Sequence, residues 1–244
     1  MTINRTFNLN TAHPSWHDCL KSALEQMNPA YLNTLYHSTQ WLPGPEKIFN
    51  AFSLPLDKVQ YILFGESPYP RAQSANGYAF WDAAVNTLWS ETGLSKPVNR
   101  ATSLRNMIKM LLVSEGILDP KQTGQSDITK IDKSQLIATN QELFSHLLDK
   151  GFLLLNATLV LQPGQVRKDA IAWHPFIKYI LAFLSKNNPT TQLILFGNIA
   201  NVIDKLAGHH YSRKLYAEHP YNLSFISNHQ VIEFFKPLHL LIKP

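Results

Sequence analysis

The sequence is poor in cysteine and contains no long apolar run. Cys19 is the single cysteine among 244 residues, so an intrachain disulfide and a cysteine-based metal cluster are both excluded. Unbroken apolar runs, such as 152–155 and 193–196, fall far short of the ~20 residues that span a bilayer. The first residues contain no apolar signal core. These absences predict a cytoplasmic protein with no membrane contact.

Charged residues are also few, and their two signs are unevenly distributed. They make up 16% of the chain against 45% hydrophobic residues, a balance that provides a large core and excludes a disordered chain. Residues 1–164 contain 13 basic and 13 acidic residues, whereas residues 165–244 contain 9 basic and 4 acidic ones, which accounts for the whole net charge of +5. A basic C-terminal third suits a polyanion such as nucleic acid. A moderately basic surface without such a partner explains the charge equally well.

Apolar patterning predicts four strands separated by helices. We expect strands at 59–65, 152–156, 192–197 and 214–217. We expect helices at 103–113, 135–150, 175–186 and 199–206, and a last one from 227 onward. Continuous apolar strands that alternate with helices are typical of a parallel sheet buried on both faces. Residues 82–100 and 117–133 are expected to be irregular. We interpret 1–244 as one domain, with 1–58 as its helical N-terminal part.

Polar residues follow each of the four expected strands. They are Gly65-Glu66-Ser67, Asn156, Gly197-Asn198 and His219. In parallel α/β sheets, ligands bind beyond the carboxyl ends of the strands. Four segments that are remote in sequence are therefore expected to meet at one crevice.

The chemistry of these side chains allows a functional and a structural interpretation. The Asn156 amide offers one donor and one acceptor group, which suits the edge of a pyrimidine base, although an asparagine also caps turns. A histidine such as His219 can donate a proton or a hydrogen bond to a developing oxyanion, or can be an ordinary loop residue. Glu66 could activate water or stabilise a cation, or it could simply be solvated.

Three aromatic residues surround the loop that follows the first strand. They are Tyr69, Phe80 and Trp81. Their rings are able to stack on a nucleobase. They could equally belong to the core, as most aromatic side chains do.

Six sequence blocks, in order, resemble the uracil-DNA glycosylases over residues 59–240. The blocks are Gly65-Glu66-Ser67-Pro68-Tyr69-Pro70 with 73–80, Ser103-Leu104-Arg105-Asn106, 153–159, 173–176, 195–198 and 219–224. The resemblance implies a three-layer α/β/α sandwich with a central four-stranded parallel sheet. It also implies a DNA repair glycosylase that hydrolyses the N-glycosidic bond of uracil, or of a related damaged base, after flipping the base out of the duplex.

The resemblance assigns roles to individual positions. Asn156 matches the residue that reads the uracil edge, and His219 matches the one that stabilises the negative charge on uracil O2. Phe80 matches the aromatic that stacks on the flipped base, and Tyr69 matches the ring that excludes the 5-methyl group of thymine. Leu223 matches the apolar wedge that enters the minor groove. Positions that grip phosphates are matched by Ser103, Gly197, Asn198 and Ser224.

The first block departs from the family pattern Gly-Gln-Asp-Pro-Tyr-His. Ser67 stands where the family has the aspartate that positions or activates water, and serine supplies no charge near neutral pH. Glu66, one position earlier, resembles the Gly-Glu-Ala-Pro-Gly variant of other branches. We therefore place Glu66 and Ser67 with His219 as catalytic candidates. The segment 81–102 is also longer than the family's usual spacing.

Two functions remain open at this level. The first is a monomeric glycosylase that acts on uracil-containing DNA with no metal or organic cofactor. The second is a protein of the same fold that binds DNA or uracil without turnover, because Ser67 replaces the acid.

Overall fold

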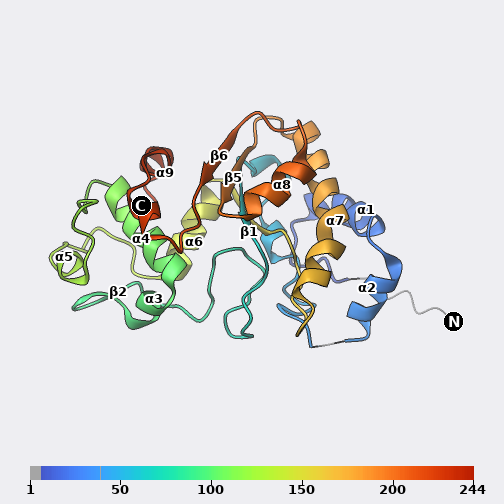
Figure 1. Cartoon of the computed structure of the whole chain (residues 1–244), viewed down its shortest axis with the longest axis horizontal. Coiled ribbons are helices and arrows are strands. Elements are labelled where there is room, and N and C mark those ends of the chain that lie inside the picture. Colours follow the sequence, from blue (N-terminus) through green and yellow to red (C-terminus); the bar gives the residue numbers. More distant parts are fainter. Residues whose placement is uncertain (1–6, 39) are drawn as a thin grey trace.

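Four short strands form a parallel sheet at the centre of the molecule (Figure 1). A computed structural model describes residues 7–38 and 40–244. The strands are β1 (Tyr61–Gly65), β4 (Phe152–Asn156), β5 (Gln192–Phe196) and β6 (Lys214–Ala217). They are hydrogen-bonded in the order β4-β1-β5-β6, and every pair is parallel. The expected sheet is confirmed, with β1 and β5 in its centre and β4 and β6 at its two edges.

Helices cover both faces of this sheet, which gives the three-layer α/β/α sandwich expected from the sequence (Figure 1). The first face is covered by α1 (His17–Glu25), α2 (Pro29–Tyr36), α7 (Val166–Asn187) and α8 (Ile199–Ala207). The second face is covered by α4 (Thr102–Ser114), α6 (Asn140–Asp149) and α9 (His229–Phe235). Short 3-10 turns lie at η1 (Pro14–Trp16), η2 (Asn50–Ser53), η3 (Leu56–Lys58), η4 (Leu223–Ser227) and η5 (Lys236–Leu238).

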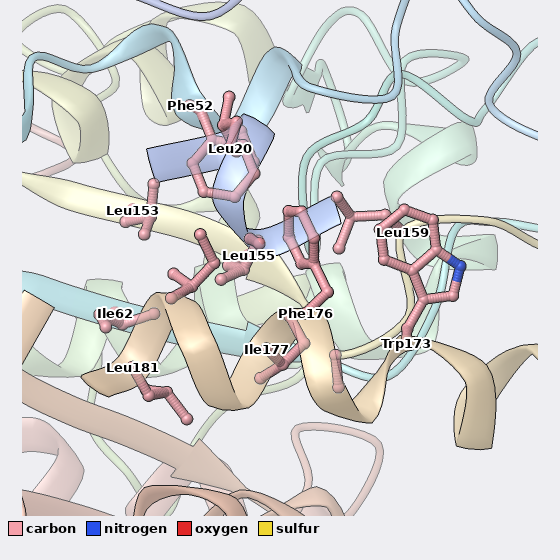
Figure 2. Packing of buried hydrophobic residues seen from close by; sticks show 14 of the residues in the cluster. Leu20, Phe52, Ile62, Leu153, Leu155, Leu159, Trp173, Phe176, Ile177 and Leu181 are labelled. Carbon is pink, nitrogen blue, oxygen red and sulfur yellow. The ribbon is translucent and has the colours of Figure 1, made fainter. Parts of the chain in front are cut away.

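Alternating strand residues separate the core into two layers. On β1, Ile62 and Phe64 join the first layer, while Leu63 between them joins the second. Figure 2 shows the first layer, in which Phe176 and Ile177 of α7 lie against the strands. Side chains that point to opposite faces in turn are what an extended strand requires. A sheet buried on both faces is rigid, so its strand ends can hold side chains in fixed positions.

The N-terminal part packs into the first core layer. Leu20 of α1 and Phe52 of η2 are fully buried in the same cluster as Leu153 and Leu155 of β4 (Figure 2). The interpretation of 1–244 as one domain stays a prediction, and it includes residues 1–6 and 39, which lie outside the described residues. No helix in the described ranges is both long enough and apolar enough to cross a membrane.

Two predicted helix boundaries are wrong. We expected a helix from 135, but α6 begins at Asn140, where Thr139 caps it and shares a capping box with Glu142. The preceding residues are extended because the Ile137 N–H donates to the Leu241 carbonyl at 2.9 Å. This pairing lies 104 positions away along the chain, so helical periodicity did not reveal it.

The helix expected at 175–186 begins nine residues earlier, at Val166. Pro175 lies inside α7, although a proline usually marks a helix end. The carbonyl that loses its partner is that of Ile171, which is 58% exposed, so water can satisfy it. The early start of α7 brings its first turns close to the carboxyl ends of the strands.

The segments expected to be irregular contain short regular elements. Residues 82–100 hold the antiparallel pair β2 (Trp89–Ser90) and β3 (Gly93–Leu94) and the helix α3 (Lys96–Arg100). Residues 117–133 hold α5 (Gln125–Thr129), which packs on β3. Elements of two to five residues are too short to show a period, and here tertiary contacts decide them.

Candidate active site

The carboxyl ends of β1 and β4 bring Gly65 beside Asn156. The two residues are register partners in the parallel ladder. A Cβ atom at Gly65 would overlap the Oδ1 of Asn156 and would lie 3.0 Å from the Cβ of Ala79. Glycine at position 65 is therefore what leaves room for the Asn156 carboxamide at the end of the sheet.

The Asn156 carboxamide is buried and still available for a ligand. The residue is 4% exposed, and its side chain has no hydrogen-bond partner among residues 7–38 and 40–244. Its polar atoms are not fully enclosed, so water can reach them before a ligand binds. A ligand edge with one complementary donor and one complementary acceptor would replace that water.

The loop after β1 returns to the outer edge of β4 and places Phe80 at the site. The Ala79 N–H donates to the Leu154 carbonyl at 3.0 Å. Phe80 follows in the left-handed region, with φ of 63°, and the Tyr69 hydroxyl donates to its carbonyl at 3.1 Å. Such a conformation is unfavourable for a bulky residue and is maintained only where surrounding contacts fix it. The loop therefore holds Phe80 in one orientation.

Tyr69 is largely enclosed by this loop. Burial raises the pKa of its hydroxyl, and the charge of Asp82 adds to that effect while Arg71 opposes it. The hydroxyl is therefore neutral and serves as the donor to Phe80. Asp82 is itself buried and pairs with Arg71 at 3.1 Å.

At the other strand pair, Gly197 lies beside His219. Gly197 has φ of +75°, and a Cβ there would be 2.8 Å from the Cβ of His219. The position thus requires glycine for its conformation as well as for space. The His219 and Phe80 rings lie 6.1 Å apart, centroid to centroid, at an interplanar angle of 29°. Asn156, Phe80 and His219 are thereby arranged around the same end of the sheet.

One hydrogen bond fixes the tautomer of His219. The Tyr221 N–H donates to Nδ1 of His219 at 3.1 Å, so Nδ1 is the unprotonated nitrogen and Nε2 carries the proton. Burial lowers the pKa of His219 from its ordinary value, and the Glu66 carboxylate raises it only in part. The ring is therefore a neutral donor near neutral pH.

Glu66 and Ser67 lie just past the end of β1. Glu66 is exposed, and its charge reaches His219. Both residues line a cavity of about 200 Å³ together with Thr158, His174 and Asn198. A carboxylate, a hydroxyl and an imidazole around one small cavity are suited to holding a water molecule.

The predicted phosphate contacts lie on three elements around the site. Ser103 is in the first turn of α4 and lines a cavity of about 390 Å³ with Arg71 and Arg100. Asn198 is exposed at the start of α8. Leu223, the predicted wedge, is 71% exposed at the start of η4, and Ser224 follows it on the surface.

For Trp81, the sequence left open whether the ring stacks on a base or belongs to the core. Trp81 stacks on Phe144 at 5.2 Å, with an interplanar angle of 8°, so it belongs to the second core layer. Asn106 belongs to the block 103–106 but has no role assigned by the resemblance; in the structure it is fully buried and donates a hydrogen bond to the loop after His219. The described residues contain no group of three or more His, Cys, Asp or Glu side chains that could hold a metal ion. A larger cavity of about 860 Å³, lined by residues of α2 and α7, includes none of the predicted site residues.

The sandwich, its strand order and the asparagine and histidine beyond the strand ends define a protein of the uracil-DNA glycosylase superfamily. The wild-type UNG crystal structure from Nitratifractor salsuginis is 40% identical in sequence to this chain. It matches with a TM-score of 0.91 over 97% of this chain and 95% of that chain. The chain belongs to the uracil-DNA glycosylase family.

More distant relatives agree with this assignment. A uracil-DNA glycosylase of Streptococcus mutans is 26% identical over 219 residues, which are 87% of this chain and 85% of that protein. The mimivirus uracil-DNA glycosylase has a TM-score of 0.59 over 87% of this chain and 71% of that chain, and its 18% identity shows the fold alone. No protein-family model matches the sequence.

Proposed function

We propose that this protein hydrolyses the N-glycosidic bond of uracil in DNA, with the base flipped out of the duplex and held among Asn156, Phe80 and His219. The observation that supports this most strongly is the buried, unpartnered Asn156 carboxamide at the same end of the sheet as a neutral histidine. A base inside a stacked duplex cannot reach such a pocket, so the proposal requires flipping.

Asn156 would read the base. Uracil presents a donor at N3 and an acceptor at O4, which match the acceptor and the donor of one carboxamide. Cytosine presents an acceptor and a donor at the corresponding positions, so it would leave both amide groups unpaired as long as the carboxamide keeps the observed orientation, with Oδ1 toward Gly65. Unpaired buried polar groups are costly, and selectivity for uracil would come from that cost. Phe80 would stack on the face of the bound base.

His219 would stabilise the departing base. Breaking the glycosidic bond leaves negative charge on the uracil ring and positive charge on the sugar. Because Nδ1 accepts from Tyr221, the Nε2–H is the group free to donate to the developing oxyanion at O2. A donor that is already oriented before reaction lowers the barrier without reorganisation.

Glu66 would provide the negative charge that the family places one residue later. Its carboxylate can stabilise the cationic sugar, and Ser67 can orient the attacking water by a hydrogen bond. Their shared cavity with His174 gives that water a place. This division of roles accounts for the absence of an aspartate at position 67.

The surrounding surface would hold the DNA. Ser103, Gly197, Asn198 and Ser224 would contact backbone phosphates, and Leu223 would fill the space that the base leaves in the duplex. All of these residues come from one chain, which supports a monomer as the active form. Because DNA is the substrate, the proposal also places the enzyme inside the cell, in the compartment that holds the DNA.

The direct test is incubation with an oligonucleotide that contains one uracil, followed by alkali. Strand cleavage at the uracil position is expected, together with free uracil as the second product. An otherwise identical thymine oligonucleotide is the matched control and should stay intact. Size-exclusion chromatography of the active fraction tests the monomer.

Two substitutions distinguish catalysis from binding without turnover. Ser67→Asp should raise excision, because it restores a charge at the family position, and Glu66→Gln should abolish most of it. If neither the parent nor Ser67→Asp released uracil, the protein would be a binder that has lost catalysis.

A further inference from the structure

The segment after β6 contains both His219 and Leu223, and a side chain from α4 is hydrogen-bonded to it. Asn106 lies on α4, within the second core layer, and is fully buried. Its Nδ2 donates to the Pro220 carbonyl at 2.8 Å and approaches those of Tyr221 at 3.3 Å and Asn222 at 3.4 Å. The side-chain amide of Asn106 thus lies within hydrogen-bond distance of three successive carbonyl oxygens of the same turn.

One peptide group connects the hydrogen bonds of Asn106 to the imidazole of His219. The peptide that follows Pro220 supplies the Tyr221 N–H that donates to Nδ1 of His219. The Asn222 N–H closes the turn onto the His219 carbonyl at 2.9 Å. Asn106 therefore fixes the peptide plane whose N–H determines which nitrogen of His219 carries the proton.

We propose that Asn106 is a positioning residue for catalysis: by holding the carbonyls of residues 220–222, it aims the Tyr221 N–H at His219 and sets the loop in its reactive shape before DNA binds. The proposal rests on the proposed function for its kinetic readout. It also concerns a structural state of His219 that can be observed without activity.

Buried residues anchor only the two ends of this loop, since Pro220 is buried on one side and Phe225 of η4 on the other. Between them, Tyr221 and Leu223 are 67% and 71% exposed, so their side chains bury little area against the protein. The orientation of the peptide groups at residues 220–222 therefore depends mainly on hydrogen bonds. The amide donor itself is enclosed by the core, where an unsatisfied partner would be costly and the bond is correspondingly persistent.

The first test is Asn106→Leu, which has a similar shape and no donor. We expect kcat for uracil excision to fall by about 10²-fold, as for a misplaced catalytic group, with KM changed about threefold or less. In ¹⁵N NMR of the histidine ring, the parent should show a protonated Nε2 and a bare Nδ1. The variant should show a mixture of the two tautomers.

A matched control removes a similar bond at a distance from the site. Asn188 donates its side-chain amide to the Val59 carbonyl, beside the opposite end of the sheet. Asn188→Ala should lower thermal stability and leave both kcat and the His219 ring signals unchanged. A kcat loss in Asn106→Leu no larger than in this control, with parent-like ring signals, would overturn the proposal.

Asn106→Asp keeps the test decisive if the leucine variant does not fold. The protonated carboxyl group can donate to a carbonyl, whereas the carboxylate cannot. The ratio of variant to parent kcat should therefore rise as the pH is lowered. A ratio that does not depend on pH overturns the proposal. A parent that releases no uracil refutes the proposed function instead, and the ring signals then decide the role of Asn106 alone.

Discussion

The two strand pairs of the sheet present their functional side chains in the same way but hold them differently. In each pair, a glycine lies at the end of the central strand or directly after it, and it leaves room for a side chain that lies at the end of the edge strand or just beyond it. Gly65 of β1 makes room for Asn156 of β4, and Gly197 after β5 makes room for His219 after β6.

The difference lies in how the two edges are covered. All five residues of β4 are buried, and the Ala79 N–H closes its outer edge. By contrast, β6 is partly exposed, and His219 lies two residues beyond it. Asn156 is held by the sheet itself, whereas His219 depends on the hydrogen bonds of its loop, which Asn106 of α4 contacts. The two candidate site residues thus have separate supports, which can be disturbed separately.

The strongest disturbance should come from removing the imidazole. His219→Ala is expected to lower the excision rate by about 10²–10³-fold, as for other lost oxyanion donors, with little change in DNA affinity. Single-turnover excision and equilibrium binding to the same oligonucleotide measure the two effects. Equal losses in rate and affinity would mark His219 as a phosphate contact instead.

Gly65→Ala should damage the site and spare the fold. The added methyl group would displace the Asn156 carboxamide, which is the end of a side chain, and would lie 3.0 Å from the Cβ of Ala79, so the backbone at Ala79 has to move only slightly. We expect excision to fall by about 10²-fold while the melting temperature changes little. Excision at the parent rate would show that Asn156 does not read the base in the observed orientation.

Gly197→Ala should affect both stability and the site. Its Cβ would press on the Cβ of His219, and its φ of +75° disfavours any L side chain. The conformational cost is about 1–2 kcal/mol, which corresponds to a decrease in melting temperature of roughly 2–8 °C for a chain of this size. Thermal unfolding of the two glycine variants side by side tests the contrast, and equal melting temperatures would contradict it.

The smallest expected effect concerns pH. The Glu66 carboxylate raises the pKa of His219, against the larger lowering by burial, so Glu66→Gln should move that pKa further down. NMR titration of the His219 ring measures the shift. Because the folded pKa lies below the ordinary value of 6.5, the unfolded chain binds this proton more readily. The contribution of His219 to stability is therefore complete above that value and declines as the pH falls below it.

The sequence was sufficient for the sheet and for placing Asn156 and His219 at the same end of it. The strands are mainly apolar, and these two residues lie at a strand end and in the loop after another strand, which is why fold logic could place them together. The roles of the candidate site residues stay a prediction. The internal order of the site was not predictable. The bond from Tyr69 to Phe80 and the contact of Gly65 with Asn156 depend on three-dimensional packing that no local pattern encodes.

Asn106 illustrates the same limit. Its position on the buried side of a helix is typical of an ordinary core residue, apart from its polarity. Only the structure shows that its amide reaches a turn more than a hundred residues later. A buried asparagine in an otherwise apolar helix was the available signal, since polar groups in a core need partners.

The strand order also predicts which strands unfold locally most often. Amides of β1 are hydrogen-bonded within a sheet that has a neighbouring strand on each side, whereas β6 has a neighbour on one side only. Hydrogen–deuterium exchange should therefore be slower in β1 than in β6. Transient opening at β6 would release the histidine while the asparagine stays in place, so the enzyme could lose its catalytic power for brief intervals without losing its ability to distinguish one base from another.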